Sequence, residues 1–163
     1  MVAKKSPLVL ETFFVVENRF KFIQPNDELQ NPQTELFDHY EIDLDFSIRP
    51  VSEENEPVIT FNVFTKVSVN QPKQPLDGYS AFMEVVGAYS LPKESLSDKD
   101  IENLMSLSAL SIMINCLRGV LMDITSNAPL GRYILPSIDV NDLLKQKAGK
   151  RKRKVRKIDK ENL

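Results

Sequence analysis

The sequence contains very few of the residues on which many enzymes and metal sites depend. Its 163 residues include one cysteine (Cys116), one histidine (His39), five glycines and no tryptophan. A single thiol forms no intrachain disulfide and no cysteine-rich zinc site. The five glycines include no Gly-x-Gly-x-x-Gly or Walker-type loop, and no Gly-x-Ser-x-Gly elbow accompanies His39. We therefore expect a protein that is not an enzyme and that needs no cofactor or metal.

A long hydrophobic run is also missing. The longest uncharged stretch, residues 103–117, has 15 residues and includes several Ser and Asn, whereas a membrane span needs about 20 apolar residues. Glu11 and Glu17 interrupt the apolar stretch near the N-terminus, so we expect no secretory signal. A composition of 42% apolar and 27% charged residues suits one globular domain. The sequence predicts a cytoplasmic protein without a membrane span.

The net charge of −2 conceals an uneven distribution. Residues 145–163 contain ten Lys and Arg against two acidic residues, while residues 1–144 contain 11 basic and 21 acidic residues. A basic run repels itself and stays solvated unless an anion binds it. We predict a folded domain over residues 1–147 and a basic, disordered tail over residues 148–163. This tail either stays solvated, acts as a nuclear localisation signal, or binds nucleic acid, the ribosome or anionic lipid non-specifically.

The first half of the chain has the residue pattern of β-strands. Strands are predicted at residues 8–24, 39–49, 58–69 and 79–91, with a bulge or turn at Asn18 and Arg19. Residues 25–38 have the composition of a loop and are numerous enough to cross over a sheet. The short connections between the later strands favour antiparallel pairing. These features predict an antiparallel sheet with one crossover loop.

The predicted strand at residues 39–49 alternates between apolar and acidic side chains. Because side chains alternate between the two faces of a strand, Glu41, Asp43 and Asp45 should share one face. Two interpretations fit this pattern. The strand face is either simply solvated, or it attracts a basic partner and speeds its docking.

A long apolar helix is predicted from residue 101 to about residue 126, after a capping-box-like start at Ser97. A helix that is apolar nearly all round needs burial on more than one side. Small residues recur along this helix at steps of three or four residues, with Ile112 beside them. This stripe predicts packing against a helix of another subunit. The alternative is coverage by the C-terminal segment, in which Asp139 should cap a short helix from Val140 to about Lys147. The candidate oligomer interface consists of Ser108, Ser111, Ile112, Asn115 and Gly119.

Residues 114–126 and 133–144 of the C-terminal half read INCLRGVLMDITS and YILPSIDVNDLL. These two segments resemble the end of the SecB protein-export chaperone family. Residues 7–14, PLVLETFF, are similar to the shorter SecB-like relatives, including those beside toxin–antitoxin pairs. Two departures are visible. Residues 128–132 (APLGR) replace the family's Gly-x-Phe-Pro-Pro loop, and only Arg118 remains of its Pro-Tyr-Ala-Arg-like turn.

The resemblance implies an α+β fold with a four-stranded antiparallel sheet, a crossover loop, one long helix and a short C-terminal helix. It implies an ATP-independent holdase for unfolded or nascent polypeptides, serving protein export or an aggregation-prone client such as an antitoxin. It further implies a homotetramer, built as a dimer of dimers, and contact between the acidic strand face and the SecA translocation motor. The alternative function is a nucleic-acid- or ribosome-binding adaptor that acts through the basic tail.

The candidate client-binding residues are apolar side chains beside the crossover loop and in the C-terminal segment. A flexible apolar surface and strand edges are sufficient to hold an unfolded chain. The alternative is that these side chains are shielded within the core of one subunit. The candidates are Phe20, Phe22, Ile23, Tyr133, Leu135, Leu143 and Leu144.

Overall fold

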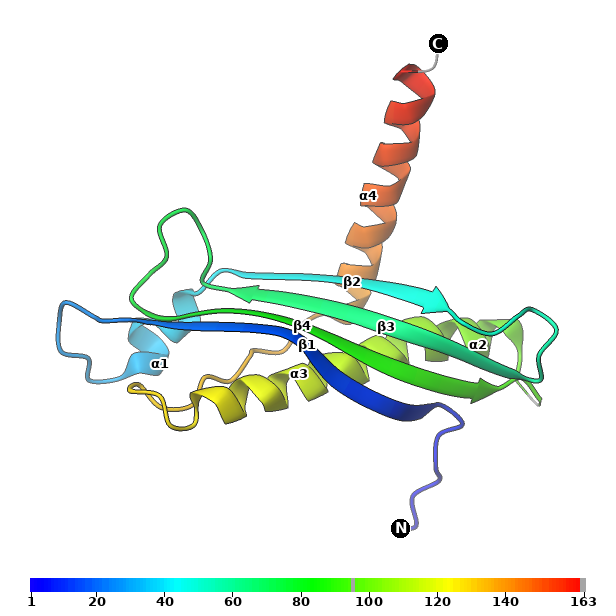
Figure 1. Cartoon of the computed structure of the whole chain (residues 1–163), viewed down its shortest axis with the longest axis horizontal. Helices are drawn as coiled ribbons and strands as arrows, with labels where there is room; N and C mark the ends of the chain where they lie inside the picture. Colours follow the sequence, from blue (N-terminus) through cyan, green and yellow to red (C-terminus); the bar gives the residue numbers. More distant parts are fainter. Residues whose placement is uncertain (95, 162–163) are drawn as a thin grey trace.

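The computed structural model describes the backbone of residues 1–94 and 96–161 and the side chains of residues 1–94 and 96–150. Four strands form one antiparallel sheet, and a long helix covers one of its faces (Figure 1). The predicted α+β class and four-stranded antiparallel sheet are therefore confirmed. The strands are β1 (Val9–Ile23), β2 (Ile42–Pro50), β3 (Val58–Val69) and β4 (Gly78–Pro92), in the order β1-β4-β3-β2.

The predicted crossover loop is present between β1 and β2. These strands are consecutive in the chain but form opposite edges of the sheet, so their connection must pass from one edge to the other. The connection contains α1 (Pro32–Glu35) and a 3-10 turn, η1 (Phe37–His39). Asn31 caps α1, because its side-chain oxygen accepts a hydrogen bond of 3.1 Å from the N–H of Gln33. Phe37 is buried and anchors the connection to the core.

β1 contains two irregularities, and neither lies at Asn18 and Arg19, where the sequence predicted a bulge. The pairing with β4 instead skips Glu11 and Val16, while Asn18 and Arg19 are paired normally. Each extra residue moves the side chains that follow it to the opposite face of the sheet, and so changes which of them face the helices. The skip at Val16 therefore lets Phe13 and Phe20, which differ in parity, pack against the same core.

The long helix is continuous along one face of the sheet (Figure 1). It consists of α2 (Asp98–Asn103), the π-helical turn η2 (Leu104–Ser108) and α3 (Ala109–Thr125). Ser97 caps its start as predicted, since its hydroxyl oxygen accepts a hydrogen bond of 3.2 Å from the N–H of Asp100. A Cβ atom at Gly87 of β4 would overlap the Met113 sulfur, so the close approach of helix and sheet depends on this glycine.

The final helix, α4 (Val140–Glu161), begins where the sequence predicted it and continues past Lys147, where its end was expected. The carboxylate of Asp139 accepts a hydrogen bond of 3.0 Å from the N–H of Asp142 at its start. The helix starts beside β2 and projects from the body (Figure 1). The side chains of residues 151–163 lie outside the described residues, so the basic tail and its anionic partner stay a prediction.

Candidate functional site

β1 is a long edge strand that is open on one side, and its stretch Phe13–Val16 is apolar, although Glu11, Glu17, Arg19 and Lys21 add charges elsewhere along it. It pairs with β4 along its length, and no other described segment pairs with it. Four of its apolar side chains are between 41% and 60% exposed: Val9, Phe14, Val15 and Val16. Soluble proteins usually protect such an edge with charge, proline or a covering element, because unpaired N–H and C=O groups are a template for another strand. The β1 edge is therefore a candidate binding surface for extended polypeptide.

Sequence reasoning did not select these four residues. The stretch from Phe13 to Val16 does not alternate between apolar and polar residues. Such a run fits both a strand buried on both faces and an exposed apolar edge. The irregularity at Val16 explains the pattern, because the extra residue lies outside the regular pairing and is 60% exposed.

A groove of about 410 Å³ lies at the end of β1, between the crossover segment and the loop after α3. It opens to solvent beside the position where the sequence predicted client binding. Its lining is mixed, because Gln24, Asp27 and Glu28 lie at it beside apolar side chains. The apolar lining residues are Phe22, Pro25, Leu29, Pro32, Pro129 and Leu130.

Only part of the predicted client-binding set meets at this groove. Phe20, Phe22 and Ile23 are half-buried at the end of β1, and Phe22 lines the groove. The rings of Phe20 and Phe22 pack on Tyr79 with centroid distances of 5.2 and 6.2 Å. Their exposed portions are available to a ligand, while their inner sides stabilise the core.

Tyr133 and Leu135 belong to the core. They are 2% and 1% exposed, so they are shielded within the core of one subunit rather than available to a client. The Tyr133 ring packs at 5.4 Å from Phe37 and at 5.8 Å from Tyr40. Burial raises the pKa of Tyr133 well above its usual value, and the nearby Tyr40 adds to the effect. Neither Tyr133 nor Leu135 reaches a ligand in this conformation.

Leu143 and Leu144 lie at the base of α4, on the other side of the sheet from β1. Both are half-buried and pack against the core. Leu143 lines a separate hollow of about 240 Å³ together with Ile42 and Leu44 of β2. The structure therefore divides the predicted client-binding residues between the β1 side and the β2 side of the sheet.

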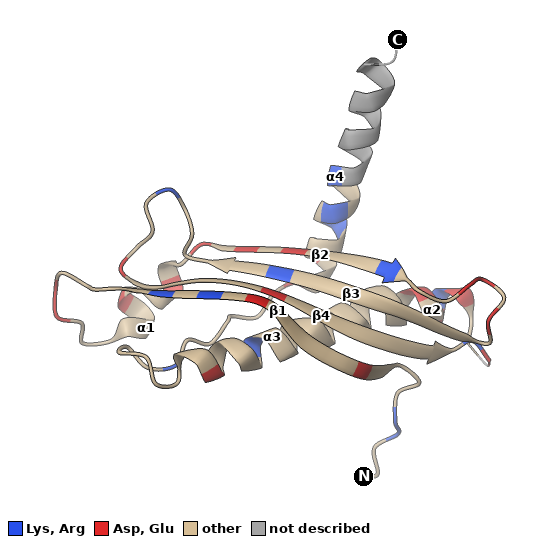
Figure 2. Ribbon diagram, in the orientation of Figure 1, with Lys and Arg blue, Asp and Glu red and all other residues tan. Residues whose placement is uncertain are grey.

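Glu41, Asp43 and Asp45 are exposed along the β2 edge, as the alternation predicted (Figure 2). Asp45 is already engaged, because its carboxylate lies 2.5 Å from the Lys147 ammonium of α4. Burial raises the pKa of Asp45, but hydrogen bonds from Lys147 and the N–H of Phe46, with the charge of Lys147, lower it more. The net effect is a pKa below the usual value for an aspartate.

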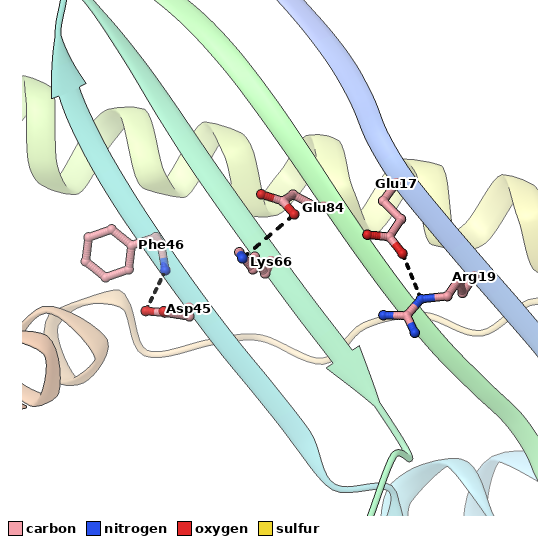
Figure 3. Close-up of polar contacts among 6 residues, drawn as sticks. All are labelled: Glu17, Arg19, Asp45, Phe46, Lys66 and Glu84. Carbon is pink, nitrogen blue, oxygen red and sulfur yellow. Dashed lines mark hydrogen bonds and ion pairs between the residues drawn. The ribbon is translucent and has the colours of Figure 1, made fainter.

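The face of the sheet away from α3 carries charges of both signs (Figure 3). Lys66 of β3 is paired in register with Asp45 and lies 3.8 Å from the Glu84 carboxylate. Glu17 and Arg19 form a further ion pair of 2.9 Å on β1. Arg19 also lies over the ring of Phe82, at 4.3 Å. The acidic strand is thus the edge of a mixed surface.

The predicted oligomer stripe lies on the side of the long helix that faces away from the sheet. Its five residues are half-buried or exposed, and a Cβ atom at Gly119 would meet nothing within 4 Å. The C-terminal segment covers one flank, where Arg118 donates hydrogen bonds of 2.8 and 3.1 Å to the carbonyls of Leu135 and Pro136. Within one subunit, Asn115 and Gly119 of the stripe are exposed, whereas Ser108, Ser111 and Ile112 are half-buried and Ile112 packs against the core.

The stretch Asp98–Thr125 is apolar enough, at a mean hydropathy of 1.6, to meet the length and composition of a membrane span. Core helices of soluble proteins can also meet this criterion, and the contacts of α3 with the sheet are those of a core helix. Only 33% of its most apolar window is buried.

Within residues 1–94 and 96–150, no three His, Cys, Asp or Glu side chains are grouped as metal ligands. Cys116 is half-buried on α3, and burial raises the pKa of its thiol, which disfavours the reactive thiolate.

No protein-family model and no curated protein sequence matches the chain. Solved structures do match. The chain is similar in structure to a SecB-like chaperone. This is Rv1957 of Mycobacterium tuberculosis, in complex with a ChAD peptide from the HigA1 antitoxin, at a TM-score of 0.47 and 10% identity over 81% of this chain and 91% of that chain. A protein of unknown function from Streptococcus agalactiae matches at a TM-score of 0.47 and 10% identity, over 80% of this chain and 97% of that chain.

Proposed function

We propose that this protein is an ATP-independent molecular chaperone, a holdase that binds unfolded or nascent polypeptides. The observation that carries the proposal is the open β1 edge with its exposed apolar side chains. An extended client segment would add to this edge through main-chain hydrogen bonds, which every sequence can form. Apolar client side chains would then pack against Val9, Phe14 and Val16 and add affinity.

The groove at the end of β1 would hold a second part of the same client. Because the groove and the β1 edge are adjacent, one unfolded chain could occupy both. Binding at the first site raises the effective concentration at the second, so weak contacts combine into useful affinity without sequence specificity. The proline-containing walls of the groove, Pro25, Pro32 and Pro129, present apolar surface with few rotatable bonds.

We further propose a cytoplasmic homotetramer, a dimer of dimers in which the small-residue stripe of the long helix packs against another subunit. Small residues allow two helices to approach closely, and such packing would bury the apolar face that one subunit leaves open. The proposed clients are proteins in export or an aggregation-prone protein such as an antitoxin. The SecA motor is the proposed partner of Glu41, Asp43 and Asp45.

Aggregation of an unfolded client tests the function directly. A chemically denatured client is diluted into buffer with and without the full-length protein, and light scattering is followed without ATP. We expect suppression at roughly stoichiometric amounts. Unchanged aggregation at a several-fold excess of the protein would contradict the proposal. Multi-angle light scattering measures the assembly in parallel, where a tetramer has four times the 18.6 kDa of one chain.

A further inference from the structure

Three segments that are distant in the sequence meet at the groove at the end of β1. They are the last residues of β1, the crossover segment between β1 and β2, and the loop after α3, residues 126–132 (Figure 1). Phe22, Leu29 and Leu130 are apolar lining residues from the three segments in turn. The crossover segment and the loop after α3 lie outside the sheet, so the strand ladder does not fix the distance between these two walls.

The ring of Tyr79 joins the first two segments. Tyr79 is the second residue of β4 and is 1% exposed. The centre of its ring lies 6.2 Å from that of Phe22 at the end of β1. It lies 5.2 Å from the ring centre of Phe37, which belongs to the crossover segment and stacks on it. Aromatic pairs at these distances attract one another, so the ring holds both segments against the start of β4.

The hydroxyl of Tyr79 joins the third segment. It donates a hydrogen bond of 2.8 Å to the carbonyl of Gly131 and accepts one of 2.8 Å from the N–H of Leu130. Leu130 is held close to the sheet as a result, because a Cβ atom on Gly78 would lie 3.2 Å from its side chain. One buried side chain therefore contacts all three segments that line the groove.

We infer that Tyr79 is a positioning residue for the client groove, and that its hydroxyl holds Leu130 in place as a wall before a client arrives. This inference rests on the proposed holdase function. Tyr79 is too deeply buried to contact a client, so it acts through Leu130. A wall that is already in place does not have to be ordered when the client binds. Ordering one such side chain on binding costs about two- to ten-fold in affinity.

Tyr79→Phe in the full-length protein tests the inference, because it removes the hydroxyl and keeps the ring. Tyr89→Phe is the matched control: Tyr89 is also 1% exposed, and its hydroxyl donates a hydrogen bond of 3.1 Å to the carbonyl of Ala109, outside the groove. We expect exchange of the Leu130 amide hydrogen to become about two- to ten-fold faster in Tyr79→Phe and to stay unchanged in the control. Equal exchange in the two variants would overturn the inference.

Binding of a labelled, uncharged, extended peptide of alternating apolar and polar residues gives the functional result. We expect its affinity for Tyr79→Phe to be about two- to ten-fold below that for Tyr89→Phe. If the wild-type protein binds the peptide and these two variants bind it equally, the inference fails while the proposed function stands. If the wild-type protein does not bind it, the proposed function fails and the inference with it.

A double-mutant cycle separates positioning from a general loss of stability. Leu130→Ala removes the side chain that Tyr79 is inferred to position, and it should weaken peptide binding by itself. Because Tyr79 acts through Leu130, adding Tyr79→Phe to Leu130→Ala should cause no further loss of affinity. Losses that add independently would show that the hydroxyl does not act through Leu130 and would overturn the inference.

Discussion

A charge introduced into the open edge should abolish much of the client binding. Val16 is exposed, is skipped by the β1–β4 register, and ends the apolar stretch Phe13–Val16 of β1. Val16→Asp removes apolar surface and places a carboxylate where a client strand would approach. The substitution site is exposed, so the fold should tolerate it with a change in stability of about 0.5 kcal/mol.

The magnitude follows from the exposure of Val16. Burying a whole Val side chain contributes about 1.5–3 kcal/mol. Val16 is 60% exposed, so covering its exposed part would contribute about 0.9–1.8 kcal/mol, which is about 5- to 20-fold in affinity. The carboxylate also has to lose water on binding, so this range is the minimum expected loss.

Val51→Asp is the matched control. Val51 is 63% exposed but follows β2, at the start of the connection to β3, and lies outside β1 and its groove. Fluorescence anisotropy with a labelled uncharged peptide measures affinity, and light scattering of an aggregating client measures holdase activity. We expect both to weaken for Val16→Asp and to stay near wild type for Val51→Asp. Equal effects in the two variants would refute the assignment of the β1 edge.

Three further predictions concern stability. Asn70→Ala should lower the free energy of unfolding by about 2–4 kcal/mol in urea titrations, because the Asn70 side chain makes two hydrogen bonds to Leu76 of the β3–β4 connection and donates a third to the carbonyl of Tyr79 in β4. Gly87→Leu should cost about 1–3 kcal/mol or more through overlap with Met113, whereas a tolerated leucine would contradict the close helix–sheet approach. The Asp45 pKa is lowered in the folded state, so its contribution is present above about pH 4 and lost as pH falls through the folded-state pKa. Asp45→Asn should remove this pH dependence from the urea midpoint, and an unchanged dependence would show that the pair with Lys147 adds no stability.

The periodicities of the sequence were sufficient to predict the four strands, the long helix and much of the core, but not α1, η1 or the extent of α4. Alternation in β2 and β3 identified which side chains point inward, because a strand with one buried face needs period two. Ser97 and Asp139 marked helix starts through side-chain capping, which depends only on neighbouring residues. The length of the β1–β2 connection was enough to predict the crossover.

Other features depend on contacts between distant parts of the chain. The irregularity of β1 was expected at Asn18 and Arg19 but occurs at Glu11 and Val16, because β4 decides the register. Tyr133 was predicted to bind client polypeptide. Only its ring contacts with Phe37 and Tyr40 of the crossover segment show that it belongs to the core.

The candidate site shows the same division. The sequence alone predicted apolar residues near a crossover loop and three carboxylates on one strand face. It did not predict that β1 stays open while the start of α4 lies beside β2, since an edge is defined by which strands do not pair. It did not predict the contact of Asp45 with Lys147, which are far apart in the chain and meet only when α4 crosses β2. Local patterns therefore determined the elements and their inward faces, while tertiary packing decided which surfaces are left for a partner.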